Sequence, residues 1–190
     1  MYDYITIERS YASGGNEIAK ELAKRLGYRL YDHNVVVETC KQLNLPYNMI
    51  SEMDEQVPVK TIFNVPGEKY LSMEEQIFNK EKEIIEKAAE EPGCIFVGRC
   101  ASEILKEKKC LRVFITAPDA YRAKRTETVE KIPKDQVQKT MRKFDTKREK
   151  FFTTHSGAKW GSSDYFDIIL NSETLGMETC VALLQAAAEK

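Results

Sequence analysis

Short apolar runs alternate with longer amphipathic segments along most of the chain. The runs rich in β-branched and aromatic residues lie at 4–8, 29–31, 94–97, 111–116 and 166–170. Such runs predict strands, and because most are continuously apolar rather than alternating, they are typical of strands buried on both faces of a parallel sheet. The pattern predicts an α/β fold, in which a five-stranded parallel sheet lies between helices as a three-layer α/β/α sandwich.

The segments between these runs carry helical periodicity. The predicted helices lie at 15–26, 34–43, 73–89, 101–106, 119–129, 134–154 and 175–188. Ser72 and Glu75 have the spacing of a capping box, and Pro118 and Pro133 precede two further helices. Prolines and a glycine interrupt the periodicity over 50–72, which predicts a mobile insertion rather than a second domain. We therefore expect one domain over 1–190, with a helical insertion after the second strand and a helical arm before the fifth.

Composition narrows the class of function. The 190 residues are 42% hydrophobic and 31% charged, as in an ordinary globular domain with a sizeable core. A net charge of -1 argues against a general binder of nucleic acid or anionic membranes. The N-terminus shows no leader pattern, and the five scattered cysteines lack C-x-x-C spacing, so we expect reduced thiols in the cytoplasm. Two histidines give little support to a His-rich metal site.

A Ser/Gly turn joins the first strand to the first helix. This order places the free N–H groups of a helix N-terminus at the sheet edge, where they can bind phosphate. In the pattern G-x-x-x-x-G-K-[ST] the lysine neutralises phosphate. Aligned on Gly14, however, Arg9 stands in the place of the first glycine, Gly15 in the place of the lysine, and Asn16 follows. The turn could form an anion-binding nest, or it could be a plain turn with Ser13 as the helix N-cap.

Charged residues follow several of the strands, and the carboxyl ends of parallel strands meet at one ligand-binding edge. Arg9 could supply the charge of the absent lysine, or it could form an ion pair with Asp32. Asp32 is either a helix N-cap or a carboxylate that orients an acceptor group. Arg99 begins a helix, where a cation opposes the dipole unless an anion is near. It is therefore a candidate for substrate phosphate, with a structural salt bridge as the alternative.

The predicted arm carries charges at helical spacing. Arg122 and Arg125 lie three residues apart, and Arg142, Asp145 and Arg148 repeat that spacing on the next helix. A run of cations is commonly a solvated face. Because the two helices flank a short connection, they could also form a flap whose arginines fold over polyphosphate and exclude water.

In this order the motifs resemble those of the cytidylate kinase-like family, a branch of the P-loop nucleoside monophosphate kinases. The matching pieces are I-T-I-E-R-S-Y-A-S-G-G-N-E-I-A at 5–19, I-F-V-G-R-C-A at 95–101, K-W-G at 159–161 and I-I-L-N-S-E-T-L-G at 168–176. The resemblance covers nearly the whole chain. It implies a P-loop NTPase-type fold with a nucleotide-monophosphate-binding insertion at about 33–72 and a lid-like arm at about 119–160.

The resemblance also implies a reaction, the transfer of the ATP γ-phosphoryl group to CMP, dCMP or a related acceptor with Mg²⁺. The residues it assigns to the ATP loop are Ser13, Gly14, Gly15, Asn16 and Glu17, with Glu17 as the one candidate for a Mg²⁺ contact. Those it assigns to catalysis are Arg9, Asp32, Arg122, Arg125 and Arg148. Those it assigns to the acceptor are Asp32, Arg99 and Asp145.

Two departures from the family pattern leave other functions open. The loop lysine and its Ser/Thr are absent, and the arginine of the S-G-G-R-E loop common in the lookalike branch is Asn16 here. A nucleotide-binding sensor or pseudokinase without catalysis is one alternative, and a structural or partner-binding domain is another. The expected partner is a nucleotide or another phosphorylated small molecule, without nucleic acid or membrane, and a homodimer stays open.

Overall fold

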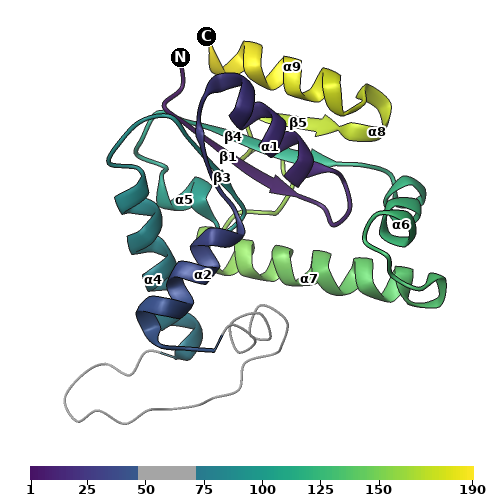
Figure 1. Cartoon of the computed structure of the whole chain (residues 1–190), viewed down its shortest axis with the longest axis horizontal. Helices are drawn as coiled ribbons and strands as arrows, with labels where there is room; N and C mark the ends of the chain where they lie inside the picture. Colours follow the sequence, from purple (N-terminus) through teal and green to yellow (C-terminus); the bar gives the residue numbers. More distant parts are fainter. Residues whose placement is uncertain (47–71) are drawn as a thin grey trace. The chain divides into compact units, whose positions relative to one another are not determined.

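The structure is a computed structural model that describes residues 1–46 and 72–190 (Figure 1). The chain divides into two compact units, one formed by Met1–Tyr31 with Glu91–Lys190 and the other by Asp32–Glu90. The insertion predicted over 50–72 falls outside the described residues except for Ser72. No helix within the described ranges is long and apolar enough to cross a membrane.

The larger unit is built on a parallel sheet of five strands in the order β2-β3-β1-β4-β5. The strands are β1 (Tyr4–Arg9), β2 (Arg29–Tyr31), β3 (Cys94–Val97), β4 (Cys110–Thr116) and β5 (Ile168–Asn171). The predicted α/β fold is confirmed. The last strand begins two residues later than its apolar run, because Phe166 packs its ring against Phe114 and Asp167 pairs with Arg112.

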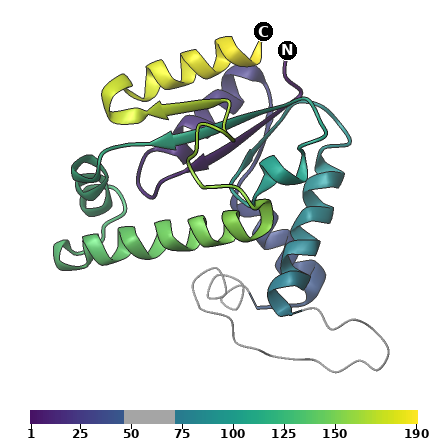
Figure 2. The same ribbon diagram turned by 180° about the vertical axis from the view of Figure 1, so that it is seen from behind.

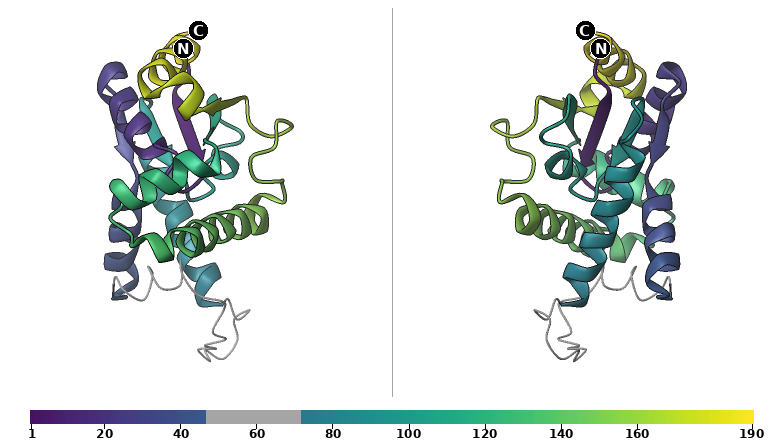
Figure 3. Two further views of the ribbon diagram at one scale, coloured as in Figure 1. Left: turned by 90° about the vertical axis from the view of Figure 1, so that its right-hand side faces the viewer. Right: turned by 90° about the vertical axis from the view of Figure 1, so that its left-hand side faces the viewer.

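Helices cover both faces of this sheet. The helices of this unit are α1 (Gly15–Leu26), α5 (Ala101–Ile104), α6 (Asp119–Thr128), the 3₁₀ turn η1 (Lys134–Gln136), α7 (Val137–Ser156), α8 (Ser172–Leu175) and α9 (Met177–Ala188). α1 and α9 lie side by side on one face, and α7 crosses the other (Figures 1 and 3). The helix predicted over 175–188 begins at Met177, since Gly176 with φ 75° separates it from α8. The termini lie together (Figure 2), and the Tyr2 amide donates to the Ala188 carbonyl at 2.7 Å.

The two faces of the sheet have different chemistry, because successive strand residues point to opposite sides. Ile5 and Ile7 of β1 belong to an aliphatic cluster that includes Leu22 of α1 and Leu184 of α9. The alternate positions, Thr6 and Glu8, are buried polar residues. Across the unit, a second group of side chains is aromatic; its ring contacts join Phe114, Trp160, Phe166, Phe152 and Tyr165. The aliphatic layer fixes β1 against α1, and the loop between them is therefore held at both ends.

The smaller unit contains α2 (His33–Leu43) and α4 (Met73–Ala88), which pack against each other. Its small core consists of Val36, Cys40 and Ile77. The predicted capping box is confirmed, since the Glu75 amide donates to Ser72 Oγ and the Ser72 amide donates to the Glu75 carboxylate.

Candidate functional site

The loop between β1 and α1 borders a cavity of about 310 Å³. It is lined by the chain from Arg9 to Glu17 with the exception of Ser13, and by Lys20, Glu130 and Arg148. Gly14 is the N-cap of α1, with φ 83° and no side-chain capping bond. The first turn of a helix presents amide N–H groups that have no partner within the helix. The cavity therefore combines helix-terminal donors with three cationic side chains, which is suitable for an anion.

Ser13 fixes the loop through its backbone rather than lining the cavity. The N-cap is Gly14, so the interpretation of Ser13 as the N-cap is wrong. Ser13 is 1% exposed, and its carbonyl accepts a hydrogen bond from Ser172 Oγ at 2.5 Å. A Cβ at Gly14 would lie 2.6 Å from the Met177 methyl, and the φ of 83° also disfavours a side chain there. The turn is thus held tightly against the start of α9.

Arg9 crosses the space that a side chain at position 15 would need. A Cβ at Gly15 would lie 2.6 Å from Arg9 Cβ and 2.9 Å from its Cγ, and a Cβ at Gly98 would lie 2.5 Å from Arg9 Nη1. Arg9 Nε donates to Asn16 Oδ1 at 2.9 Å. Because Arg9 fills this space, a lysine at position 15 could not be accommodated without moving it. The loop therefore lacks a lysine at position 15 because the Arg9 side chain already fills the space that the lysine would need.

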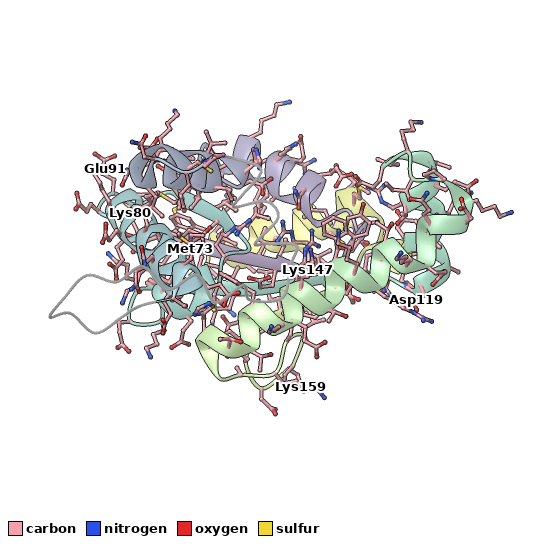
Figure 4. All side chains as sticks on the ribbon, turned by 90° about the horizontal axis from the view of Figure 1, so that it is seen from below. Met73, Lys80, Glu91, Asp119, Lys147 and Lys159 are labelled. Atoms are coloured by element: carbon pink, nitrogen blue, oxygen red, sulfur yellow. The ribbon has the colours of Figure 1, made fainter. Side chains whose placement is uncertain are left out.

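Three arginines of the arm donate to carbonyls of the same loop. Arg148 Nη1 donates to the Arg9 carbonyl at 3.0 Å, and Arg122 Nη1 donates to the Tyr11 carbonyl at 3.2 Å. Arg125 Nε donates to the Ala12 carbonyl at 3.1 Å, and its Nη2 forms an ion pair with Glu17. Figure 4 views this arm from below, with Asp119 on α6 and Lys147 on α7 labelled. The arm therefore shapes the loop backbone directly.

Asp145 links one of these arginines, Arg122, to the backbone of the loop. Its Oδ1 accepts from the Tyr11 amide at 2.7 Å, and its Oδ2 accepts from Arg122 Nη1 at 2.6 Å. Arg122 also forms an ion pair with Asp119 at 2.6 Å. The Tyr11 ring stacks on Phe144 with centroids 4.6 Å apart and planes inclined by 6°. Of the arm residues predicted from the sequence, Arg148 lines the cavity, while Arg122, Arg125 and Asp145 support the loop that forms it.

The charges at the cavity floor influence one another. Burial, and then the positive charge of Arg9, lowers the pKa of Arg148 to about 9. Glu8 is 5% exposed, and its burial raises the pKa of its carboxyl, whereas the nearby charges of Arg9 and Arg148 lower it. A bound anion would reduce the repulsion between the two guanidinium groups.

The remaining predicted residues lie outside the residues that line this cavity. Arg99 and Cys100 have φ 59° and 52°, a left-handed conformation that is strained for side chains other than glycine. The Arg99 guanidinium carbon lies 6.0 Å from the centroid of the Phe151 ring. Burial raises the pKa of the Cys100 thiol, which favours a packing role. Asp32 begins the smaller unit at the N-cap position of α2 but makes no side-chain capping bond.

Two cavity residues were missed by sequence reasoning. Lys20 lies on α1 one turn after Asn16, and that i+4 spacing from the loop could have identified it. Glu130 follows α6 in the connection of the arm, and no local pattern indicates that it reaches the cavity.

The residues present fit phosphate better than they fit a dedicated metal site. The glycine backbone at Gly14 and Gly15 allows close approach of an anion, and Arg9 and Arg148 supply charge. Within the described ranges no group of three metal-ligating side chains occurs. Mg²⁺ in kinases is commonly bound through substrate phosphates, water and one or two carboxylates, and Glu17 could supply one carboxylate.

Comparisons with known proteins show the family of the chain and the proteins that share its fold. The profile of the cytidylate kinase-like family matches residues 4–174. An uncharacterized protein from Eubacterium ventriosum ATCC 27560 is similar in structure, with 22% identity, a TM-score of 0.75 and 98% of each chain covered. Shikimate kinase from Bacteroides thetaiotaomicron is similar with 13% identity, a TM-score of 0.61 and 100% of each chain covered. A gluconokinase from Sinorhizobium meliloti 1021 has 13% identity and a TM-score of 0.56, with 98% of this chain and 93% of its own covered. No curated protein matches the sequence.

Proposed function

The chain belongs to the cytidylate kinase-like family, and on this basis we propose that it transfers the γ-phosphoryl group of ATP to a nucleoside monophosphate of the CMP or dCMP type. Its P-loop kinase fold is compatible with this reaction class. The scattered cysteines, none of them in a disulfide, fit a reducing compartment, and we place the protein in the cytoplasm.

One observation carries the proposal: Arg9 and Arg148 line the same cavity as the first turn of α1. Two neighbouring cations at helix-terminal donors favour a multiply charged anion over a neutral ligand. A polyphosphate has the charge and the oxygen acceptors to bind both groups. The cavity is therefore assigned to the phosphates of the donor nucleotide.

The acceptor side of the proposal rests on Arg99. Arg99 is held in a strained backbone conformation after β3, and such strain is characteristic of functional positions. Arg99 would bind the acceptor phosphate, and the role that the resemblance gives Asp32, of orienting the acceptor, stays a prediction. A phosphate oxygen of the acceptor forms the new bond to the γ-phosphorus as the bond to ADP breaks. ATP supplies the transferred group, and Mg²⁺ when bound neutralises its charge.

The arm has a positioning role in this scheme. Arg122 and Arg125 would fix the Tyr11 and Ala12 carbonyls by hydrogen bonds and so keep the loop in one conformation, with the amides of the first turn of α1 left to the phosphates. Preorganised donors of this kind stabilise developing charge without reorganisation during the reaction.

ADP formation measured with ATP, Mg²⁺ and a panel of nucleoside monophosphates tests the proposal. We expect turnover above the ATP-only rate with CMP or dCMP, and a loss of at least about 100-fold in Arg99→Ala. Arg25→Ala is the matched control, because Arg25 forms exposed ion pairs with Glu21 and Glu178. Background rates with every acceptor, or equal rates in the two variants, would refute it.

A nucleotide-binding protein without catalysis is the second candidate, and one contact favours it. Asn16 replaces the hydroxyl residue expected to contact Mg²⁺, and its side-chain oxygen accepts from Arg9. This candidate predicts that ATP raises the melting temperature while no acceptor yields ADP, since any ligand of the native state stabilises it. A structural domain would show neither effect.

A further inference from the structure

We infer that Lys20 supplies, from the second turn of α1, the flexible cation that position 15 of the loop cannot carry. The inference rests on the proposed binding of polyphosphate in the cavity. It assigns to Lys20 the outer phosphate group of the bound chain, with Arg9 and Arg148 contacting groups nearer the loop.

Position 15 cannot carry a long side chain in this loop. A Cβ at position 15 would lie 2.6 Å from Arg9 Cβ. Arg9 Cβ is bonded directly to the backbone of β1, so it cannot move away unless the strand shifts. The Arg9 head is oriented by the bond from its Nε to Asn16. A flexible cationic side chain that contacts the outer phosphate must therefore come from a residue outside the loop.

Lys20 has the required position. It lies four residues after Asn16 and three after Glu17, spacings that bring side chains onto the same face of a helix. It lines the cavity and is exposed at its rim. Within the described part of the chain, the side chain of Lys20 forms no hydrogen bond or ion pair. Its ammonium group is thus available to a ligand.

The charges around Lys20 favour a ligand over an internal partner. Glu17, the nearest carboxylate along its helix face, is already paired with Arg125. Glu130 also lines the cavity and is the alternative partner for Lys20. An ammonium on a flexible stem is a compact point charge that can follow a phosphate group, whereas a guanidinium fork prefers a fixed geometry. The arginines and Lys20 are therefore suited to different parts of one polyphosphate.

Calorimetric titration of inorganic pyrophosphate and of ATP, without metal, tests the inference in wild type, Lys20→Ala, Lys20→Arg and Lys24→Ala. Lys24 is the matched control, since it is an exposed lysine one turn further along α1 and does not line the cavity. We expect Lys20→Ala to weaken both ligands roughly tenfold through loss of a charge-assisted hydrogen bond. Lys24→Ala should stay within about twofold, and Lys20→Arg should recover part of the affinity.

The outcomes separate this inference from the proposed function. If wild type binds both ligands and Lys20→Ala binds them equally well, the inference is wrong while the proposed function stands. If Lys24→Ala loses as much affinity as Lys20→Ala, the loss reflects the overall positive charge of the helix and not a contact from Lys20. The inference is then again wrong. If wild type binds neither ligand, the proposed function itself fails, and the inference fails with it. Melting temperatures without ligand should agree within about 1 °C, because substitutions at exposed sites alter stability little.

Discussion

Two groups of cations contact the same loop and differ in their surroundings. Arg122 forms ion pairs with Asp119 and Asp145, Arg125 forms one with Glu17, and both arginines donate to loop carbonyls. Arg9 and Arg148 line the cavity, and burial, followed by the charge of Arg9, lowers the pKa of Arg148. A neutralised arginine can hold a backbone in place, whereas adjacent arginines at a cavity favour an anion. The first group is expected to govern stability and the second to govern binding.

The largest expected effect is the loss of stability in Arg122→Ala. The Arg122 side chain is 10% exposed and the Asp145 side chain 21%, so the variant leaves a largely buried carboxylate without its cation. We expect the free energy of unfolding to fall by about 3 kcal/mol, measured by urea denaturation.

Arg125→Ala is the control for this loss. Its partner Glu17 is 45% exposed at the side chain, so the ion pair contributes at most about 1 kcal/mol. Equal losses in the two variants would contradict the distinction between the largely buried Arg122–Asp145 pair and the more exposed Arg125–Glu17 pair.

The next effect concerns binding and compares Gly98→Ala with Gly27→Ala. Both glycines have left-handed φ angles, 73° and 67°, so each substitution costs about 1 kcal/mol of backbone strain. Only at Gly98 would the new Cβ meet Arg9, whereas Gly27 has open space. We expect Gly98→Ala alone to weaken pyrophosphate binding roughly tenfold in calorimetry, since its Cβ moves the charge that binds the anion. Unchanged affinity in Gly98→Ala would show that Arg9 does not need its present position.

The sequence was sufficient for much of the fold because its signals are local. The bounds of α1 follow from its periodicity, and the Ser72 capping box follows from its spacing. The predicted start of β5 was two residues too early. Phe166 is apolar, but it packs its ring against Phe114 and lies outside the strand.

The candidate site was accessible to sequence reasoning only in part. The loop and the positions of Arg9 and Arg148 were predicted, because the order of strand, turn and helix indicates the loop. That Arg9 occupies the space of a side chain at position 15 depends on distances across the fold. The bonds from Arg122 and Arg125 to the loop likewise join residues more than 100 positions apart, which no local spacing could indicate.

A smaller effect is expected in Glu17→Gln. The substitution removes a carboxylate from the cavity lining and breaks an exposed ion pair, so pyrophosphate without metal should bind about threefold more tightly. Calorimetry with and without Mg²⁺ measures it. Weaker binding without metal would show that Glu17 supports the loop more than it repels the anion.

The smallest effect concerns Glu8 and depends on pH. Burial raises the pKa of this carboxyl above its ordinary value of 4.5. The folded state therefore favours the protonated carboxyl, and this contribution to stability is full below pH 4.5 and is lost as the pH rises through the folded-state pKa. Glu8→Gln should therefore be more stable than wild type at pH 7, and the gain should vanish toward pH 4. Thermal unfolding across this range measures it, and a gain that grows on acidification would contradict the sign.

The most direct test of the account is the titration of pyrophosphate into wild type and Arg9→Ala, with thermal unfolding measured on the same samples. The account predicts that wild type binds, that Arg9→Ala loses roughly 100-fold in affinity, and that the melting temperature falls more in Arg122→Ala than in Arg9→Ala. Equal affinity in wild type and Arg9→Ala would contradict the claim that Arg9, which fills the space of a side chain at position 15, binds the phosphates.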